Sequence, residues 1–199
     1  DSPPATAPAN PAQQPDAHRV FLADGDALAL PTAQLLAILR ELARVLPRLA
    51  RVSCYAAPTN IQRKSAAELA LLQQHKLNLL YVGVESGSDL MLKKITKGAT
   101  QRRMAEVLHK AHASGMKVSA TVILGLGGRT HSEEHIAGTI ALLNSTPVTY
   151  LSTLQLYLDD SIEEEFYRKF GEPFEALDDL AILREQQSLI SGLNPPQPV

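Results

Sequence analysis

The stretch LNLLYVGVE, residues 77–85, decides the fold class of this chain. It is a short and strongly apolar run, which predicts a strand buried in a sheet. Helical patterns flank it on both sides. Residues 65–76 begin with the capping-box pair Ser65 and Glu68, and residues 88–98 predict a short helix closed by Gly98. A buried strand between two helices indicates a parallel sheet covered by helices.

The same alternation runs through most of the chain and gives an α/β protein with five parallel strands. Helices are expected over residues 30–47, with Thr32 as N-cap, and over 100–115 and 131–146. The five strands are expected near 19–23, 51–56, 78–84, 117–124 and 149–156. We expect an open, curved sheet with its helices outside. The pattern alone leaves a doubly wound sheet and a full or partial barrel both open.

The two ends of the chain differ from this body. Residues 1–18 are rich in Pro and Ala and predict a disordered linker, which implies a further segment before it, and residues 194–199 predict a disordered tail. The β/α body is expected over 19–160, followed by C-terminal helices over 161–193.

Composition excludes several classes of protein. The chain has 199 residues, a formal net charge of −2 and 45% hydrophobic residues, so nothing indicates binding to nucleic acid or to a membrane surface. No apolar run approaches the roughly 18 residues of a membrane span. The single cysteine, Cys54, excludes an internal disulfide and a four-cysteine metal site, and its position within a strand predicts a buried small hydrophobe. A reducing, cytoplasmic location is expected.

Polar and glycine-rich segments follow the strands, and they suggest a ligand site. The carboxyl ends of parallel strands meet at one edge of a sheet, so these segments are expected to converge. Carboxylates accept hydrogen bonds from ammonium and hydroxyl groups, and glycines allow a ring to approach the backbone, so a ligand with an amine, hydroxyls and a flat base would suit them. The segments are Asp24–Asp26, Pro58–Asn60, Glu85–Gly87, Gly125–Gly128 and Gln155–Tyr157.

Other motifs in the sequence suggest different functions. HSEEH, residues 131–135, matches an inverted zinc-peptidase pattern in which His131 and His135 would bind zinc and Glu134 would act as base. A helix start rich in acids is the simpler interpretation, and we expect no zinc there. The glycine run lacks the spacing of a dinucleotide fingerprint, because position 130 is threonine. Three lysines after Glu85 predict a solvated basic face: Lys93, Lys94 and Lys97.

Four stretches in order resemble the radical S-adenosylmethionine (SAM) superfamily, in the branch related to oxygen-independent coproporphyrinogen oxidase. They are VFLADGDALALP (20–31), YAAPTNIQRKSAAEL (55–69), LLYVGVESGSDLMLKKITKGAT (79–100) and VILGLGGRTHSEEH (122–135). The resemblance implies a partial barrel of six β/α units. It implies that Gly25 and Asp26 hold the amino group of SAM, that Glu85 and Ser86 hold the ribose, and that the segment from Ile123 to Gly125 packs on the adenine.

The chain departs from this superfamily in one large respect. The cysteine motif that binds a 4Fe–4S cluster after the first strand has no counterpart, and five units are present where six are expected. Because such a cluster needs thiolates, its ligands are not in this chain.

The resemblance therefore implies the C-terminal portion of a radical SAM enzyme, inactive by itself. The full enzyme would cleave SAM at the cluster and abstract a hydrogen atom from an unknown small-molecule substrate, with a reductant such as flavodoxin or ferredoxin. The alternatives are a non-catalytic binding module that keeps the barrel without a cluster, and the zinc peptidase.

Overall fold

Five parallel strands form a single sheet in the order β1-β2-β3-β4-β5. The computed structural model describes residues 17–196, so the linker predicted at 1–18 and the tail at 194–199 lie largely outside the described residues. All five predicted strands are confirmed: β1 (Arg19–Leu22), β2 (Arg51–Tyr55), β3 (Leu77–Glu85), β4 (Lys117–Leu124) and β5 (Tyr150–Gln155).

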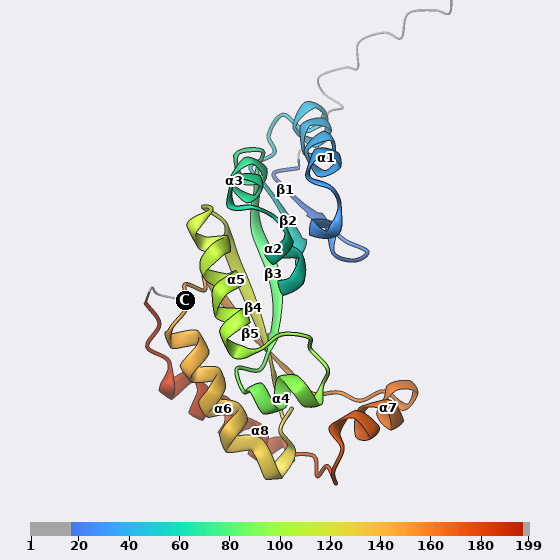
Figure 1. The fold of residues 1–199 in the computed structure, drawn as a ribbon, viewed down its shortest axis with the longest axis vertical. Helices are drawn as coiled ribbons and strands as arrows, with labels where there is room; N and C mark the ends of the chain where they lie inside the picture. Colours follow the sequence, from blue (N-terminus) through green and yellow to red (C-terminus); the bar gives the residue numbers. More distant parts are fainter. Residues whose placement is uncertain (1–16, 197–199) are drawn as a thin grey trace, which may run out of the picture.

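Helices follow the strands along the chain, as predicted (Figure 1). They are η2 (Ala27–Ala29), α1 (Thr32–Val45), α2 (Pro58–Arg63), α3 (Ala66–Gln74), α4 (Asp89–Lys94), α5 (Gln101–Ala113), α6 (Gly128–Asn144), α7 (Asp160–Phe170) and α8 (Asp179–Gly192). In Figure 1, α5 and α6 lie to the left of the strands and α7 lies to the right. None of the helices in residues 17–196 is long and apolar enough to cross a membrane.

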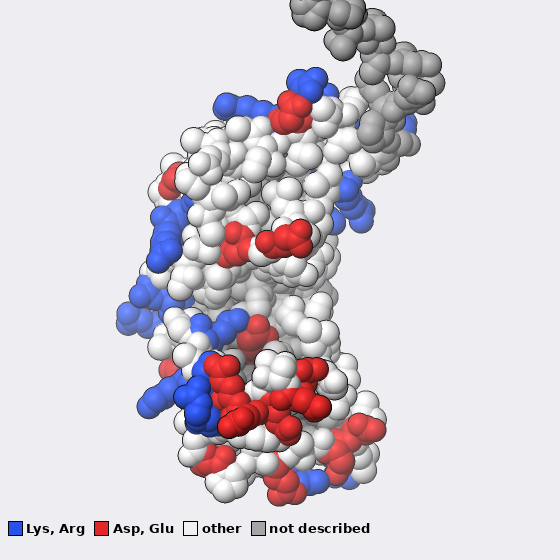
Figure 2. Space-filling view, turned by 90° about the vertical axis from the view of Figure 1, so that its right-hand side faces the viewer, with Lys and Arg blue, Asp and Glu red and all other residues white. Residues whose placement is uncertain are grey.

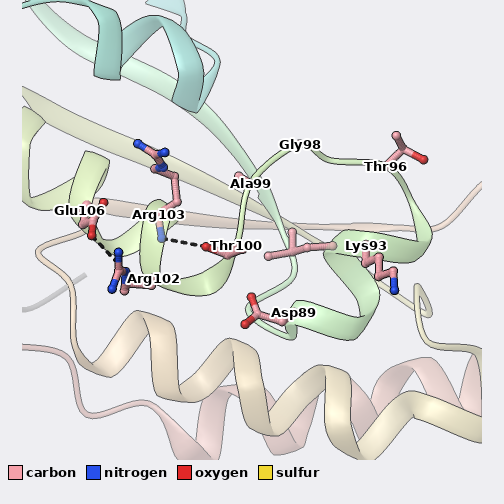
Figure 3. Close-up of a pocket in the computed structure, with 10 residues that line it drawn as sticks. Asp89, Lys93, Thr96, Gly98, Ala99, Thr100, Arg102, Arg103 and Glu106 are labelled. Carbon is pink, nitrogen blue, oxygen red and sulfur yellow. Dashed lines mark hydrogen bonds and ion pairs between the residues drawn. The ribbon is translucent and has the colours of Figure 1, made fainter.

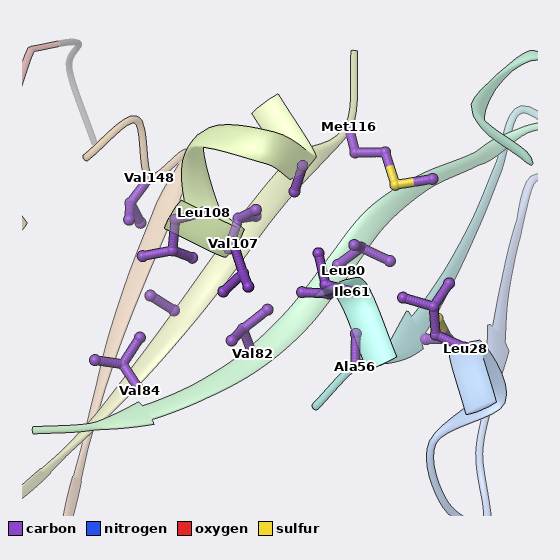
Figure 4. Packing of buried hydrophobic residues seen from close by; sticks show 14 of the residues in the cluster. Leu28, Ala56, Ile61, Leu80, Val82, Val84, Val107, Leu108, Met116 and Val148 are labelled. Carbon is purple, nitrogen blue, oxygen red and sulfur yellow. The ribbon is translucent and has the colours of Figure 1, made fainter. Parts of the chain in front are cut away.

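One face of the sheet is packed under helices and the other is largely open. On β3, Leu80, Val82 and Val84 are fully buried, whereas Tyr81 and Gly83 between them are partly exposed. Figure 4 shows Val82 and Val84 beside Val107 and Leu108 of α5. A doubly wound sheet is covered on both faces and reverses its strand order, and this sheet does neither, so the partial barrel is the better description.

Two predicted helix starts were wrong. Thr32 is not an N-cap: Pro31 holds that position, and the Thr32 hydroxyl donates to Glu68 Oε1 of α3 at 2.6 Å. Helix α6 begins at Gly128, three residues before the predicted start, because the glycine run turns directly into the helix. The capping box of Ser65 and Glu68 is confirmed, and Glu68 therefore serves both its own helix and α1.

Candidate functional site

A cleft of about 540 Å³ lies on the open face of the sheet, near the carboxyl ends of the strands. It is lined from segments far apart in sequence, among them Asp26 after β1, Glu85 at the end of β3 and Ile123 near the end of β4. Figure 2 looks onto the side of the molecule that is on the right in Figure 1, and it shows a hollow across the middle with acidic residues above and below it. The structure thus brings three of the six predicted site residues together.

Asp26 is held in place by three hydrogen bonds. Its Oδ1 accepts from the N–H of Leu28, as the N-cap of η2, and its Oδ2 accepts from the N–H of Ala57 at 2.6 Å and from Asn60 Nδ2 at 2.7 Å. Asp26 therefore ties the segment after β1 to the start of α2 after β2. A carboxylate has about four acceptor positions, so one remains for a ligand.

Gly25, beside it, is exposed and has φ +117°, with nothing within 4 Å of the position that a Cβ would take. It provides the tight turn that presents Asp26, because a residue with a Cβ rarely adopts this backbone conformation. Gly25 is not among the residues that line the cleft.

Glu85 is fixed in an unusual backbone conformation at the base of the cleft. Its φ is +62°, which is costly for a residue with a Cβ and is typical of functional sites. The carboxylate folds back over Gly83, where any Cβ would overlap with Oε1 of Glu85. It then pairs with Lys97 at 2.9 Å, with the two side chains 19% and 21% exposed. A side chain at position 83 would therefore displace the Glu85 carboxylate from its present place.

The prediction that the lysines after Glu85 form a solvated face was wrong for two of them. Lys97 lies in the cleft on Glu85. Lys94 donates to the carbonyl of Phe170, pairs with Glu172 at 2.8 Å, and lies over the Phe170 ring. Helix α4 ends at Lys94, before the predicted end at Gly98, and the chain turns at Thr96, which has φ +55°, so that the Lys97 N–H donates to the carbonyl of Leu92. Because this left-handed position is a threonine, no glycine in the sequence signalled the return of Lys97.

An aromatic and aliphatic floor completes the cleft. Tyr55 and Tyr81 line it, and Phe21 packs edge-on against both, with ring centroids 4.8 Å and 5.2 Å away. Ile123 pairs in register with Leu154 of β5 at the other end of the cleft. This floor of flat and branched apolar groups, with charges at one side, can bind a ligand that has both a planar base and charged substituents.

Ser86 and Gly125, two of the predicted site residues, do not line the cleft. Ser86 is fully buried, and its hydroxyl lies 2.8 Å from His135 Nδ1. Gly125 is also buried; its N–H donates to Glu185 Oε2 of α8, and a Cβ on it would meet Ile182. Both residues lie just past the ends of their strands, where the left-handed φ of Glu85 and of Gly125 interrupts the extended backbone, and their contacts are with α6 and α8.

The HSEEH motif is divided between different environments. His135 is fully buried, with Nδ1 on Ser86 and Nε2 3.0 Å from the carbonyl of Ile123, while His131 bonds to Glu172. Glu134 accepts from the Ser88 hydroxyl. Within residues 17–196, no group of three or more His, Cys, Asp or Glu side chains is placed to hold a metal ion. The geometry therefore gives no support to the zinc-peptidase alternative.

Burial of His135 makes stability depend on pH. It lowers the pKa of His135 to about 4, so the unfolded chain, with an ordinary histidine pKa near 6.5, takes up this proton first as the pH falls. We expect the free energy of unfolding to be unaffected by this group above pH 7 and to fall by about 2 kcal/mol between pH 7 and pH 5. Urea unfolding of wild type and His135→Gln at both values checks this.

Glu185 is also buried, and burial raises the pKa of its carboxyl, so this group increases the free energy of unfolding as the pH falls, opposite to His135. The difference between wild type and His135→Gln leaves out the contribution of Glu185, which both proteins share. The variant should lose most of the pH dependence that His135 contributes. An identical pH dependence in both proteins would contradict the prediction.

A second hollow, of about 660 Å³, lies outside the sheet between α4 and α5 (Figure 3). Its lining side chains all come from the local segment 89–106, and Arg102 pairs with Glu106 at 3.3 Å within it. It joins no strand ends. The inner cleft is therefore the better candidate, although Ala99 contributes to both hollows.

Cys54 does not offer a metal ligand. It is fully buried on β2, and burial raises the pKa of its thiol to about 12, so it stays protonated at neutral pH. It is the only cysteine of the chain. The residues present therefore do not fit a 4Fe–4S cluster.

Comparison with known proteins shows the family and the fold of the chain. Residues 9–143 match the Radical SAM superfamily. The chain is 29% identical to the heme chaperone HemW of Bacillus subtilis (strain 168) over 132 residues. These residues make up 65% of this chain and 35% of HemW. The fold of this chain is similar to that of coproporphyrinogen III oxidase (HemN) from Escherichia coli, with a TM-score of 0.69 at 17% identity, over 87% of this chain and 40% of that one. The fold is also similar to that of the archaeal Elp3 of Methanocaldococcus infernus, with a TM-score of 0.64 at 15% identity, over 90% of this chain and 45% of that one.

The chain thus spans less than half the length of these relatives. The family match covers well over half of the chain and includes β1 to β4, with the three cleft residues Asp26, Glu85 and Ile123. The chain belongs to the radical SAM superfamily.

Proposed function

We propose that the cleft binds SAM and that this chain is the SAM-binding portion of a radical SAM enzyme. Membership of the superfamily implies SAM and a 4Fe–4S cluster as cofactors in general. The observation that carries the proposal is the convergence of Asp26, Glu85 and Lys97 on one cleft with an apolar floor. SAM combines an ammonium, a carboxylate, ribose hydroxyls and adenine, and each has a chemical match among these groups.

Each side chain has a proposed role in binding. Asp26 would use its remaining acceptor position for the ammonium, and Glu85 would accept from the ribose hydroxyls. Lys97 is the only cation among the described residues that line the cleft, and it would pair with the carboxylate. Ile123 and Leu154 would lie against the adenine. Gly25, Ser86 and Gly125 would act indirectly, by shaping the turns that carry Asp26, Glu85 and Ile123.

The reaction of the whole protein goes beyond what this chain can supply. We propose an oxidoreductase or lyase that abstracts hydrogen from a small-molecule substrate, with a reductant such as flavodoxin or ferredoxin. With one buried cysteine, this chain cannot hold the cluster by itself, so we expect it to bind SAM weakly and not to cleave it. The lack of thiolates also favours the second candidate, a non-catalytic module that keeps the nucleotide pocket.

Calorimetric titration with SAM tests the site. Asp26→Ala and Glu85→Ala should each weaken binding about tenfold, since a charge-assisted hydrogen bond contributes about 1.5–3 kcal/mol. Glu106→Ala is the matched control, because it removes a carboxylate from the outer hollow and should leave affinity unchanged. Equal affinity in wild type and both cleft variants would remove these residues from the site.

A further inference from the structure

One buried side chain of helix α6, His135, binds the ends of two neighbouring strands, β3 and β4. His135 is fully buried, and its two ring nitrogens reach different segments: Nδ1 lies 2.8 Å from the Ser86 hydroxyl after β3, and Nε2 lies 3.0 Å from the carbonyl of Ile123 on β4. The first contact adjoins Glu85 and the second is on Ile123 itself. Both of those residues line the cleft.

The partners fix where the protons are. A carbonyl oxygen can only accept, so Nε2 carries the proton that bonds to Ile123. Burial keeps the ring neutral at pH 7, with a pKa of about 4, so Nδ1 is an acceptor and the Ser86 hydroxyl donates to it. The Ser86 oxygen in turn accepts from the N–H of Ser88 at 3.0 Å. Every polar atom of this chain of hydrogen bonds therefore has a compatible partner.

The same helix binds each residue of the turn that follows Glu85. The hydroxyl of Thr139 accepts from the N–H of Gly87 at 2.9 Å, and Glu134 accepts from the Ser88 hydroxyl at 2.9 Å. Glu85 itself has the left-handed φ of +62°, a conformation that persists only when its surroundings hold it. The turn that imposes this conformation is thus built against α6.

We propose that His135 is a positioning residue for the ligand cleft, which sets the relative placement of Glu85 and Ile123 by binding Ser86 and the Ile123 carbonyl at once. This inference rests on the proposed binding of SAM. His135 touches no ligand and acts through the two strand ends. A histidine that merely fills the core would affect stability and leave the affinity of the folded protein unchanged.

The experiment measures SAM affinity by calorimetry and thermal stability for His135→Gln and Ser86→Ala. Each variant should weaken SAM binding about fivefold, and the double variant should be no weaker than either one, because both break the same chain of hydrogen bonds. Ser86→Ala is the milder change and keeps the test valid if His135→Gln folds poorly. Val107→Ala, a buried truncation on α5, is the control: it should lower stability without changing affinity.

A double-mutant cycle with Glu85→Ala distinguishes a failure of this inference from a failure of the proposed function. In a Glu85→Ala background, His135→Gln should weaken binding less than it does in the wild type, because one of the two residues that it positions is gone and only the placement of Ile123 can still be disturbed. If Glu85→Ala weakens binding while His135→Gln and Ser86→Ala do not, the positioning role is wrong and the SAM site stands. If Glu85→Ala and Asp26→Ala leave binding unchanged, the proposed site fails and the positioning role fails with it.

Discussion

Gly87→Ala should lower the melting temperature by about 10 °C. The new Cβ would overlap with the carbonyl oxygen of Gly138 and lie 2.6 Å from the carbonyl carbon, so α6 would have to move away from the turn after β3. Gly138 is equally restricted, because its Cβ would lie 2.9 Å from the N–H nitrogen of Ser88. Overpacking against backbone costs about 3 kcal/mol or more, and about 2–4 °C of melting temperature follows from each kcal/mol in a chain of this size.

The control for this prediction is Gly98→Ala. Gly98 has φ +71° but nothing within 4 Å of the Cβ position, so the change introduces backbone strain without a clash. About 1–2 kcal/mol of destabilisation is expected from the left-handed conformation alone. Thermal unfolding followed by circular dichroism measures both. Equal shifts for the two variants would show that α6 does not pack on the turn as closely as described.

Charge reversal at Lys97 should have the largest effect on ligand affinity. Lys97→Glu removes the partner of Glu85, places a second carboxylate beside it, and would repel the carboxylate of SAM. Two like charges at about 4 Å repel by about 4 kcal/mol at an effective dielectric constant near 20. Together with the lost attraction, we expect SAM affinity to fall at least about a hundredfold, as measured by calorimetry.

Lys93→Glu makes the same change in net charge outside the cleft. Lys93 is exposed on α4 and lines the outer hollow in Figure 3, so its reversal alters only the long-range field. Affinity for SAM should change by less than about twofold, since exposed charges are screened at physiological salt. A similar loss in both variants would mean that net charge, and not a specific contact of Lys97, controls binding.

The sheet could be predicted from sequence because its evidence is local. The apolar runs on β2, β3 and β4 and the capping box before β3 specify strand and helix without reference to distant residues. The choice between barrel and doubly wound sheet needed the strand order and the open face, which are properties of the whole sheet. Helix α2 was missed because its six residues carry too few turns for a periodic pattern.

The candidate site was only partly accessible to sequence reasoning. Asp26 and Glu85 were found because strand ends of a parallel sheet share one edge, whereas Ile123 came from the resemblance to the radical SAM superfamily. Lys97, Tyr55 and Tyr81 were missed as site residues: the lysine returns by a chain reversal, and the tyrosines face the cleft through the pleat of β2 and β3. Ser86 and Gly125 were placed in the cleft by the strand-end argument as well as by the resemblance, and for both the prediction was wrong: they contact the helices, through His135 and Glu185.

The most direct test of the SAM site is a titration of the ¹⁵N-labelled chain followed through its backbone amide signals. Up to about 5 mM SAM would reveal even a millimolar dissociation constant. If the cleft binds SAM, the signals of four residues that line it should shift together with one saturation curve: Ala57, Gly83, Glu85 and Thr121. Shifts confined to the outer hollow around Thr100–Glu106, or none at all at the highest concentration, would contradict the claim that the cleft binds SAM.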